Sequence, residues 1–161
     1  MSAVIALTAP AVVVDDLRAT VEAVPDPEYP GVGVGELGIV ESVTADAGGN
    51  VEIVLVPTFL GCPALDLIAS DVTAAAKAIP WVRNADVRWA RDVAWSSVRI
   101  TGRARAFMAD ELAVAVPDTA GRAVCPVCGH DALEAVSDFG PTPCRRIARC
   151  PACRNPIEVV R

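Results

Sequence analysis

Apolar residues first recur at helical spacing near the start of the chain. One face of residues 11–23 is apolar and carries Val13, Val14, Leu17 and Val21. Thr8 is suited to cap this helix and Pro10 to occupy its first turn. Residues 24–31 contain three prolines, so the helix is expected to give way to a stiff, extended connector.

The pattern then changes to alternation, which is typical of strands. Residues 37–45 and 51–56 alternate apolar and polar side chains well enough for two strands. The sequence Asp-Ala-Gly-Gly-Asn at 46–50 is a turn between them. These segments therefore predict a β-hairpin, with Pro57 marking its end.

Helical periodicity returns in the middle of the chain. Residues 63–78 carry an apolar stripe made of Leu65, Ile68, Val72, Ala75 and Ile79. A strand is expected near residues 85–90, and a further helix over 101–113 with Thr101 as its cap. The order helix, hairpin, helix, strand, helix predicts a small α+β domain over residues 1–117.

A second domain is predicted from the cysteines that follow. Residues 114–116 are interpreted as a short apolar tail of the last helix, and residues 117–121 as a linker. Two C-P-x-C pairs then occur 21 residues apart, formed by Cys125, Cys128, Cys150 and Cys153. Paired thiolates at this spacing indicate a tetrahedral zinc site, so residues 118–161 are expected to form a zinc ribbon.

The role expected for this zinc is structural. Four thiolates fill the tetrahedron and leave no open position for chemistry. A segment this short has little apolar core, so metal binding would supply its folding energy. Gly129 allows the positive φ that such a knuckle often needs. His130 adjoins the first pair and is interpreted as a surface residue, and an iron–sulfur cluster would need the same four ligands.

Two cysteines lie outside these pairs. Cys62, between Gly61 and Pro63, is expected at the N-cap of the second helix, where amide groups and the helix dipole would lower its pKa. Cys144 lies among Arg145 and neighbouring arginines, which would also favour a thiolate. Either residue could instead be a buried packing cysteine.

Other chemistry is poorly supported by the residues. The Gly-rich stretch at 31–35 lacks the G-x-G-x-x-G pattern of dinucleotide sites, and the carboxylate after it, Glu36, is interpreted as a solvated loop residue. His130 is the only histidine, which argues against most hydrolase triads.

Composition and charge narrow the location and partners. The 161 residues carry a net charge of −6, although residues 120–161 hold six arginines against four acids. An acidic chain argues against nucleic acid as a partner. Neither a signal peptide nor an apolar run long enough for a membrane span is visible, so a cytoplasmic location is expected. Six cysteines without a secretion signal favour metal or redox chemistry over disulfides.

Three blocks of the first domain resemble a known family. They are Val-Pro-Asp-Pro-Glu-Tyr-Pro at 24–30, Glu-Leu-Gly-Ile-Val at 36–40 and Pro-Thr-Phe-Leu-Gly-Cys-Pro-Ala at 57–64. In this order they resemble the iron–sulfur assembly domain of SufT-type proteins. With Phe-Gly-Pro-Thr-Pro-Cys-Arg at 139–145, nearly the full chain resembles the PaaD (PaaJ) family, the D subunits of bacterial phenylacetyl-CoA epoxidase systems.

This resemblance implies an accessory protein that helps to mature a multicomponent monooxygenase, by delivery of a metal or an iron–sulfur cluster. It implies oxygenase or reductase subunits as partners. Family positions map onto Glu36, Thr58 and Cys62 in the first domain, and onto Cys144 and the four paired cysteines in the ribbon. The tryptophan-containing segment 89–97 and the sequence Pro-Cys-Arg-Arg at 143–146 depart from the family pattern, which leaves the client open.

Four functions remain open at this stage. The first is metal or cluster transfer through Cys62, with Glu36 or Cys144 as co-ligand. The second is a structural subunit that bridges oxygenase components without transfer. A ribbon that binds nucleic acid and a thiol redox protein using Cys62 and Cys144 are the others, and a homodimer is not excluded.

Overall fold

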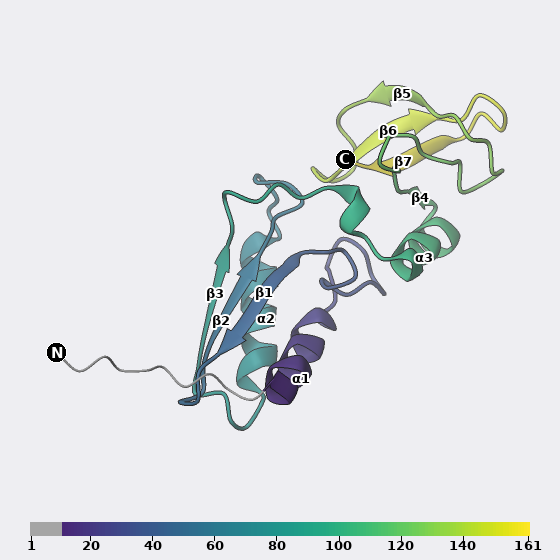
Figure 1. Ribbon diagram of the computed structural model, residues 1–161. Coiled ribbons are helices and arrows are strands. Elements are labelled where there is room, and N and C mark those ends of the chain that lie inside the picture. The colour runs from purple at the N-terminus through teal and green to yellow at the C-terminus, as the bar shows by residue number, and fades with distance from the viewer. Residues whose placement is uncertain (1–10) are drawn as a thin grey trace.

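The computed structural model describes residues 11–161, which contain three α-helices and two β-sheets (Figure 1). The expected cap Thr8 and the first-turn Pro10 lie outside the described residues. The mixed α+β class predicted from the sequence is confirmed. None of the helices in residues 11–161 combines the length and apolarity that a bilayer span requires.

The first sheet has three strands. The elements of this part are α1 (Ala11–Glu22), β1 (Val40–Ala45), β2 (Asn50–Leu55), α2 (Leu65–Lys77) and β3 (Asn84–Trp89). β1 and β2 form the expected antiparallel hairpin, and α2 connects β2 to β3, which pair in parallel. The strand order is therefore β1-β2-β3, with α1 packed on β1 and α2 on β3 (Figure 1).

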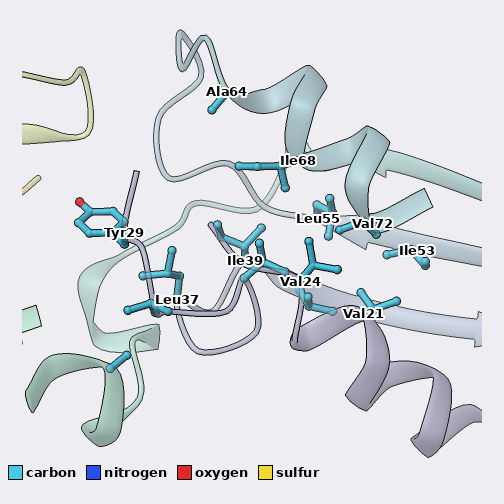
Figure 2. Close-up of a cluster of buried hydrophobic side chains, with 14 of the residues drawn as sticks. Val21, Val24, Tyr29, Leu37, Ile39, Ile53, Leu55, Ala64, Ile68 and Val72 are labelled. Carbon is cyan, nitrogen blue, oxygen red and sulfur yellow. The ribbon is translucent and has the colours of Figure 1, made fainter. Parts of the chain in front are cut away.

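The core of this domain lies between the helices and the sheet. Leu17 and Val21 of α1 are fully buried, and Ile68 and Val72 of α2 are at most 4% exposed. They pack with strand residues such as Ile53, and Figure 2 shows this cluster with Tyr29 at one end. Burying each of these aliphatic side chains contributes about 1.5–3 kcal/mol to stability. All four helix residues belong to the apolar stripes predicted from the sequence.

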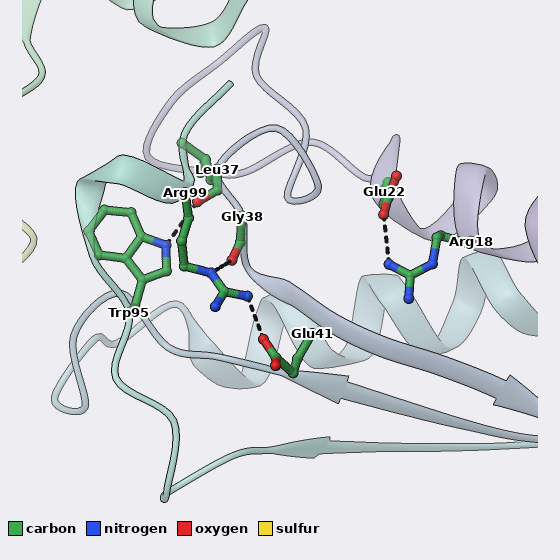
Figure 3. A network of polar contacts seen from close by, with 7 residues as sticks. All are labelled: Arg18, Glu22, Leu37, Gly38, Glu41, Trp95 and Arg99. Atoms are coloured by element: carbon green, nitrogen blue, oxygen red, sulfur yellow. Dashed lines mark hydrogen bonds and ion pairs between the residues drawn. The ribbon is translucent and has the colours of Figure 1, made fainter. Parts of the chain in front are cut away.

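The segment after β3 is tied back to the start of β1. η1 (Ser97–Arg99) is a short 3₁₀ helix. The Trp95 indole donates to the Leu37 carbonyl oxygen at 2.8 Å, and Arg99 Nε donates to the Gly38 carbonyl oxygen at 2.8 Å (Figure 3). Gly38 has φ of +68°, so the chain turns there and β1 begins at Val40 rather than at residue 37.

The second sheet contains the cysteine-rich segment. Its elements follow α3 (Gly102–Leu112) and are β4 (Val114–Ala115), β5 (Glu134–Ser137), β6 (Arg145–Arg149) and β7 (Pro156–Val160). Thr101 caps α3 as predicted, because its Oγ1 accepts from the Ala104 N–H at 3.2 Å. The strand order is β4-β7-β6-β5, with β4 parallel to β7.

The two parts of the chain meet through a shared core. Residues 114 and 115, interpreted from the sequence as the tail of a helix, instead form β4 in the ribbon sheet, because this short segment pairs with β7. Val114, Cys144 and Val160 belong to the same buried cluster as the residues of α1 and α2. The ribbon therefore packs directly onto the first domain.

Candidate metal sites

The four paired cysteines lie together at one end of the second sheet. Their sulfur atoms are all within 4.8 Å of one another. The Cys125 and Cys153 sulfurs are 3.7 Å apart, and the Cys128 and Cys150 sulfurs are 3.6 Å apart. Zinc–sulfur bonds of about 2.3 Å in a tetrahedron place the sulfurs about 3.8 Å apart. The geometry therefore fits one thiolate-bound zinc ion.

Two matching turns hold these sulfurs. The Gly129 N–H donates to the Cys125 carbonyl oxygen at 2.9 Å, and the Arg154 N–H donates to the Cys150 carbonyl oxygen at 2.8 Å. Gly129 has φ of +75° and Arg154 has φ of +62°, so both knuckles use the left-handed conformation. The expectation for Gly129 is confirmed.

Backbone amides of the knuckles also contact the sulfurs. The Asn155 backbone N–H is the main cause that lowers the pKa of Cys153 to about 6. The His130 backbone N–H likewise acts to lower the pKa of Cys128, but burial and the hydrogen bonds with the other three cysteines outweigh it and raise that pKa to about 12. The described residues that form this ligand cluster are the four cysteines alone, and the His130 side chain is not among them.

A second candidate site lies where the ribbon packs onto the first domain. It is a cavity of about 10 Å³, which is room for one water-sized guest. Three expected site residues line it, namely Thr58, Cys62 and Cys144. Thr58 and Cys62 come from the loop between β2 and α2, and Cys144 comes from the residue just before β6. The fold thus brings together two thiols that are 82 positions apart in the sequence.

The predicted environment of Cys62 is wrong in one respect. The N-cap of α2 is Ala64, and Cys62 lies in the preceding turn, where its N–H donates to the Phe59 carbonyl oxygen at 3.1 Å. Burial raises the pKa of the Cys62 thiol, although a hydrogen bond from the Ala64 backbone acts in the opposite direction. Cys62 is therefore a protonated thiol at neutral pH rather than an activated thiolate.

Cys144 contacts hydroxyl groups instead of the expected arginines. The Tyr29 hydroxyl donates to the Cys144 sulfur at 3.6 Å, and Thr142 Oγ1 lies 3.2 Å from the same sulfur. Burial, followed by the presence of Cys144, raises the pKa of Tyr29, so the phenol keeps its proton and stays a donor. The Arg145 side chain stacks on the Tyr29 ring, 4.4 Å from its centroid.

Asp26 and Trp89 are among the residues of this cavity that were not singled out from the sequence. Asp26 is only 5% exposed, and burial raises the pKa of its carboxyl even though the Glu28 and Tyr29 N–H groups donate to Oδ1. Trp89, at the end of β3, also lines the cavity. The sequence signal for Asp26 was an acidic residue between two prolines in the connector. No comparable signal marked Trp89, which is simply a tryptophan at the end of a strand.

Glu36 lies outside the cavity. Its two carboxylate oxygens accept from Arg103 at 2.7 and 2.8 Å, and Oε2 also accepts from the Gly33 N–H at 3.1 Å. These bonds connect the Gly-rich loop to the first turn of α3. The structure thus places Glu36 as a link between elements, apart from Cys62 and Cys144.

The donor set of the cavity suits a soft metal ion. Two cysteines, two hydroxyl residues and two acidic residues line a space of about 10 Å³. Sulfur ligands select ions such as Fe(II), Zn(II) and Cu(I). The cavity offers two cysteines where the ribbon cluster offers four, so a metal in the cavity would have fewer sulfur ligands than the ribbon ion.

Comparisons with known proteins agree with this two-part organisation. Residues 14–88 match the family model described as an iron–sulfur cluster assembly protein. Residues 110–161 match the PaaD zinc beta ribbon domain. The second match starts within α3 and includes β4, consistent with the pairing of β4 and β7.

Three relatives cover different parts of the chain. A protein of Escherichia coli (strain K12), assigned as the D subunit of 1,2-phenylacetyl-CoA epoxidase, is 30% identical over 154 residues, which is 90% of each chain. The Fe-S protein maturation auxiliary factor YitW of Bacillus subtilis (strain 168) is 32% identical over 48% of this chain and 81% of its own length. A crystal structure of a domain of unknown function from Bacillus anthracis has a TM-score of 0.54 and 36% identity, over 58% of this chain and 88% of that one.

The similarity to the first of these relatives extends across both domains, whereas the other two cover 48% and 58% of the chain. In this chain the iron–sulfur cluster assembly match is followed by the zinc ribbon match, and the similarity to the first relative covers 90% of the chain. The chain therefore belongs to the PaaD family, the D subunits of phenylacetyl-CoA epoxidase.

Proposed function

We propose that this protein is an accessory subunit that matures a multicomponent oxygenase of the phenylacetyl-CoA epoxidase kind. Its cargo is a soft metal such as iron, as an ion or as part of a cluster, and its partners are the oxygenase or reductase subunits that receive it. The ribbon zinc is structural. The observation that carries the proposal is that Cys62 and Cys144, from different domains, line one small cavity apart from the ribbon cysteines.

The chemistry of the cavity suits temporary binding. Cys62 and Cys144 supply two sulfur ligands, and Asp26 adds a negative charge close to them. Two sulfur ligands hold an ion less tightly than the four ribbon thiolates do. A carrier needs this difference, because it must release its cargo while it keeps its own zinc.

The size of the cavity bears on the form of the cargo. A space of about 10 Å³ accepts one atom, so an intact cluster would require the loop at 57–64 to separate from the ribbon. A single Fe(II) ion needs much less room than a cluster. We therefore expect a mononuclear ion to bind to the isolated protein.

The test is an anaerobic Fe(II) titration of zinc-loaded protein, followed by transfer to a metal-free client subunit. Wild-type protein should bind one Fe(II) beyond its zinc, and both Cys62→Ser and Cys144→Ser should lose that iron while keeping the zinc. Glu36→Gln is the matched control and should still bind iron, because Glu36 lies outside the cavity. Clients that mature normally with both serine variants would overturn the proposal and favour a bridging subunit without transfer.

A thiol redox function uses the same two cysteines, because both line the cavity. Under that function mild oxidation should join Cys62 to Cys144 in a disulfide that dithiothreitol reverses. Mass spectrometry of peptides alkylated before reduction detects this link. Reversible formation of the disulfide, together with failure of the Fe(II) titration, would select the redox function.

A further inference from the structure

The indole N–H of Trp89 is a hydrogen-bond donor without a partner among the described residues. Trp89 is the last residue of β3, pairs with Leu55 and lines the cavity that contains Cys62 and Cys144. Its Nε1–H is buried. Trp95, by contrast, donates its Nε1–H to the Leu37 carbonyl oxygen at 2.8 Å (Figure 3). Buried donors without acceptors cost stability, so an unpaired indole at a cavity calls for an explanation.

None of the described residues accepts from the indole, so its acceptor must come from the contents of the cavity. A neutral thiol accepts hydrogen bonds only weakly. A sulfur that becomes anionic, as a metal-bound thiolate or as inorganic sulfide, accepts an N–H strongly. Donors to metal-bound sulfur are an established way in which proteins tune such sites.

We propose that the Trp89 indole N–H is a positioning group for the cargo, and that it donates to an anionic sulfur in the loaded cavity. This inference rests on the proposed function, since it requires that the cavity receives a metal. The indole thus contributes nothing to the empty protein beyond its packing. Its hydrogen bond forms when a metal binds in the cavity. It therefore favours the metal-bound form of the sulfur ligand over the protonated form.

The proposal separates the effects of Trp89 on stability and on binding. If the indole N–H serves the loaded state, Trp89→Phe removes an unsatisfied donor and leaves the protein with an empty cavity nearly as stable as wild type, or more stable. The same variant should bind Fe(II) at least about tenfold more weakly, which is the usual effect of losing a hydrogen bond to a metal ligand. A purely structural indole would instead lower the melting temperature and leave the affinity of the folded protein unchanged.

The first experiment compares Trp89→Phe with Trp81→Phe in zinc-loaded protein. Trp81 is also half-buried and packs against the core of the first domain, but it does not line the cavity. Trp81→Phe therefore shows what the loss of an indole outside the cavity does. Melting temperature and anaerobic Fe(II) affinity are measured for both. A weaker affinity in Trp89→Phe alone, at similar melting temperatures, supports the proposal. Equal Fe(II) affinities in wild type and Trp89→Phe would overturn it.

A second experiment needs no variant and therefore survives poor folding of Trp89→Phe. The ¹⁵N-labelled, zinc-loaded protein is titrated with Cd(II), a diamagnetic ion that prefers thiolates, and the indole N–H resonances are followed. The Trp89 resonance should move downfield and exchange more slowly with solvent, while those of Trp81 and Trp95 stay in place. A Trp89 resonance that stays unmoved, both before and after sulfide is added, in protein that keeps its ribbon zinc and has bound Cd(II) through Cys62 and Cys144 would overturn the inference.

The same titration identifies the acceptor of the Trp89 N–H. It also distinguishes failure of the proposed function from failure of the inference about Trp89. A shift with Cd(II) alone indicates a cysteine thiolate, whereas a shift that appears only after added sulfide indicates inorganic sulfide. If wild-type protein binds no second ion, the proposed function fails and this inference fails with it. If the ion binds through Cys62 and Cys144 but Trp89 does not respond, this inference alone is lost.

Discussion

Gly38 lies where the turn before β1 meets η1, and its conformation holds the two together. Its φ of +68° is left-handed, and a Cβ at this position would lie 2.4 Å from Arg99 Cβ. Its carbonyl oxygen also accepts from Arg99 Nε. The residue is therefore constrained both by its backbone conformation and by the close approach of a neighbouring segment.

Gly38→Ala should lower the free energy of unfolding by about 2–4 kcal/mol, because left-handed strain and overpacking add together. Gly102→Ala is the control, since a Cβ there meets nothing within 4 Å. At the start of α3 it should change stability by no more than about 0.5 kcal/mol. Urea denaturation followed by circular dichroism measures both, and a similar effect of the two substitutions would contradict this account.

At the scale of elements, the sequence predicted those helices and strands that a local pattern of residues determines. α1, the β1–β2 hairpin, α2, β3 and α3 all lie close to their expected ranges, because apolar periodicity and proline or glycine breaks mark them. β4 escaped prediction because it is two residues long and its pairing partner, β7, lies more than 40 residues later. Such a strand exists through long-range pairing and leaves no periodic signal of its own.

The candidate sites divide in the same way. The four ribbon cysteines were predicted from spacing, since each knuckle is a local turn. The meeting of Cys62 with Cys144 depends on packing between elements from two domains, which local sequence does not reveal. Glu36 was mapped by resemblance, and only the fold shows that Arg103 occupies its carboxylate.

Arg145 is the side chain that fastens β6 to the connector after α1. It stacks on Tyr29, donates to the Glu28 carbonyl oxygen, and pairs with Glu158 at 2.7 Å. A planar guanidinium can make all three contacts at once, whereas an ammonium group cannot. This geometry gives a physical reason for the arginine after Cys144, one of the places where the sequence departs from the family pattern.

Arg145→Ala should therefore destabilise the protein by about 2–3 kcal/mol, because it removes charge-assisted hydrogen bonds and a cation–π contact together. Arg122→Ala is the matched control. Its only side-chain partner among the described residues is Asp118, and its own side chain is 77% exposed, so its loss should cost no more than about 1 kcal/mol. Thermal unfolding of the two variants compares them, and equal losses would show that Arg145 does not fasten the ribbon.

At the scale of the whole molecule, the zinc site and the cavity depend on each other although no residue is shared between them. The ribbon core is small and consists largely of alanine and cysteine, with Ile157 and Val159 as its main aliphatic residues. Such a core needs the metal to fold. Cys144 and Val160 of the same ribbon sheet region complete the core of the first domain, so loss of zinc should also disturb the cavity.

Removal of zinc by a chelator should thus unfold β5–β7 and expose Cys62, while β1–β3 keep their amide protection in hydrogen exchange. Burial raises the pKa of Cys62, so removing its cover should lower that pKa toward the value of about 8.5 for a free thiol. The pH at which iodoacetamide reaches half its maximal rate at Cys62 should therefore fall in zinc-free protein and rise again when zinc is restored. An unchanged alkylation profile, with the ribbon amides exchanging freely, would show that the ribbon does not cover Cys62 and that the cavity belongs to the first domain alone.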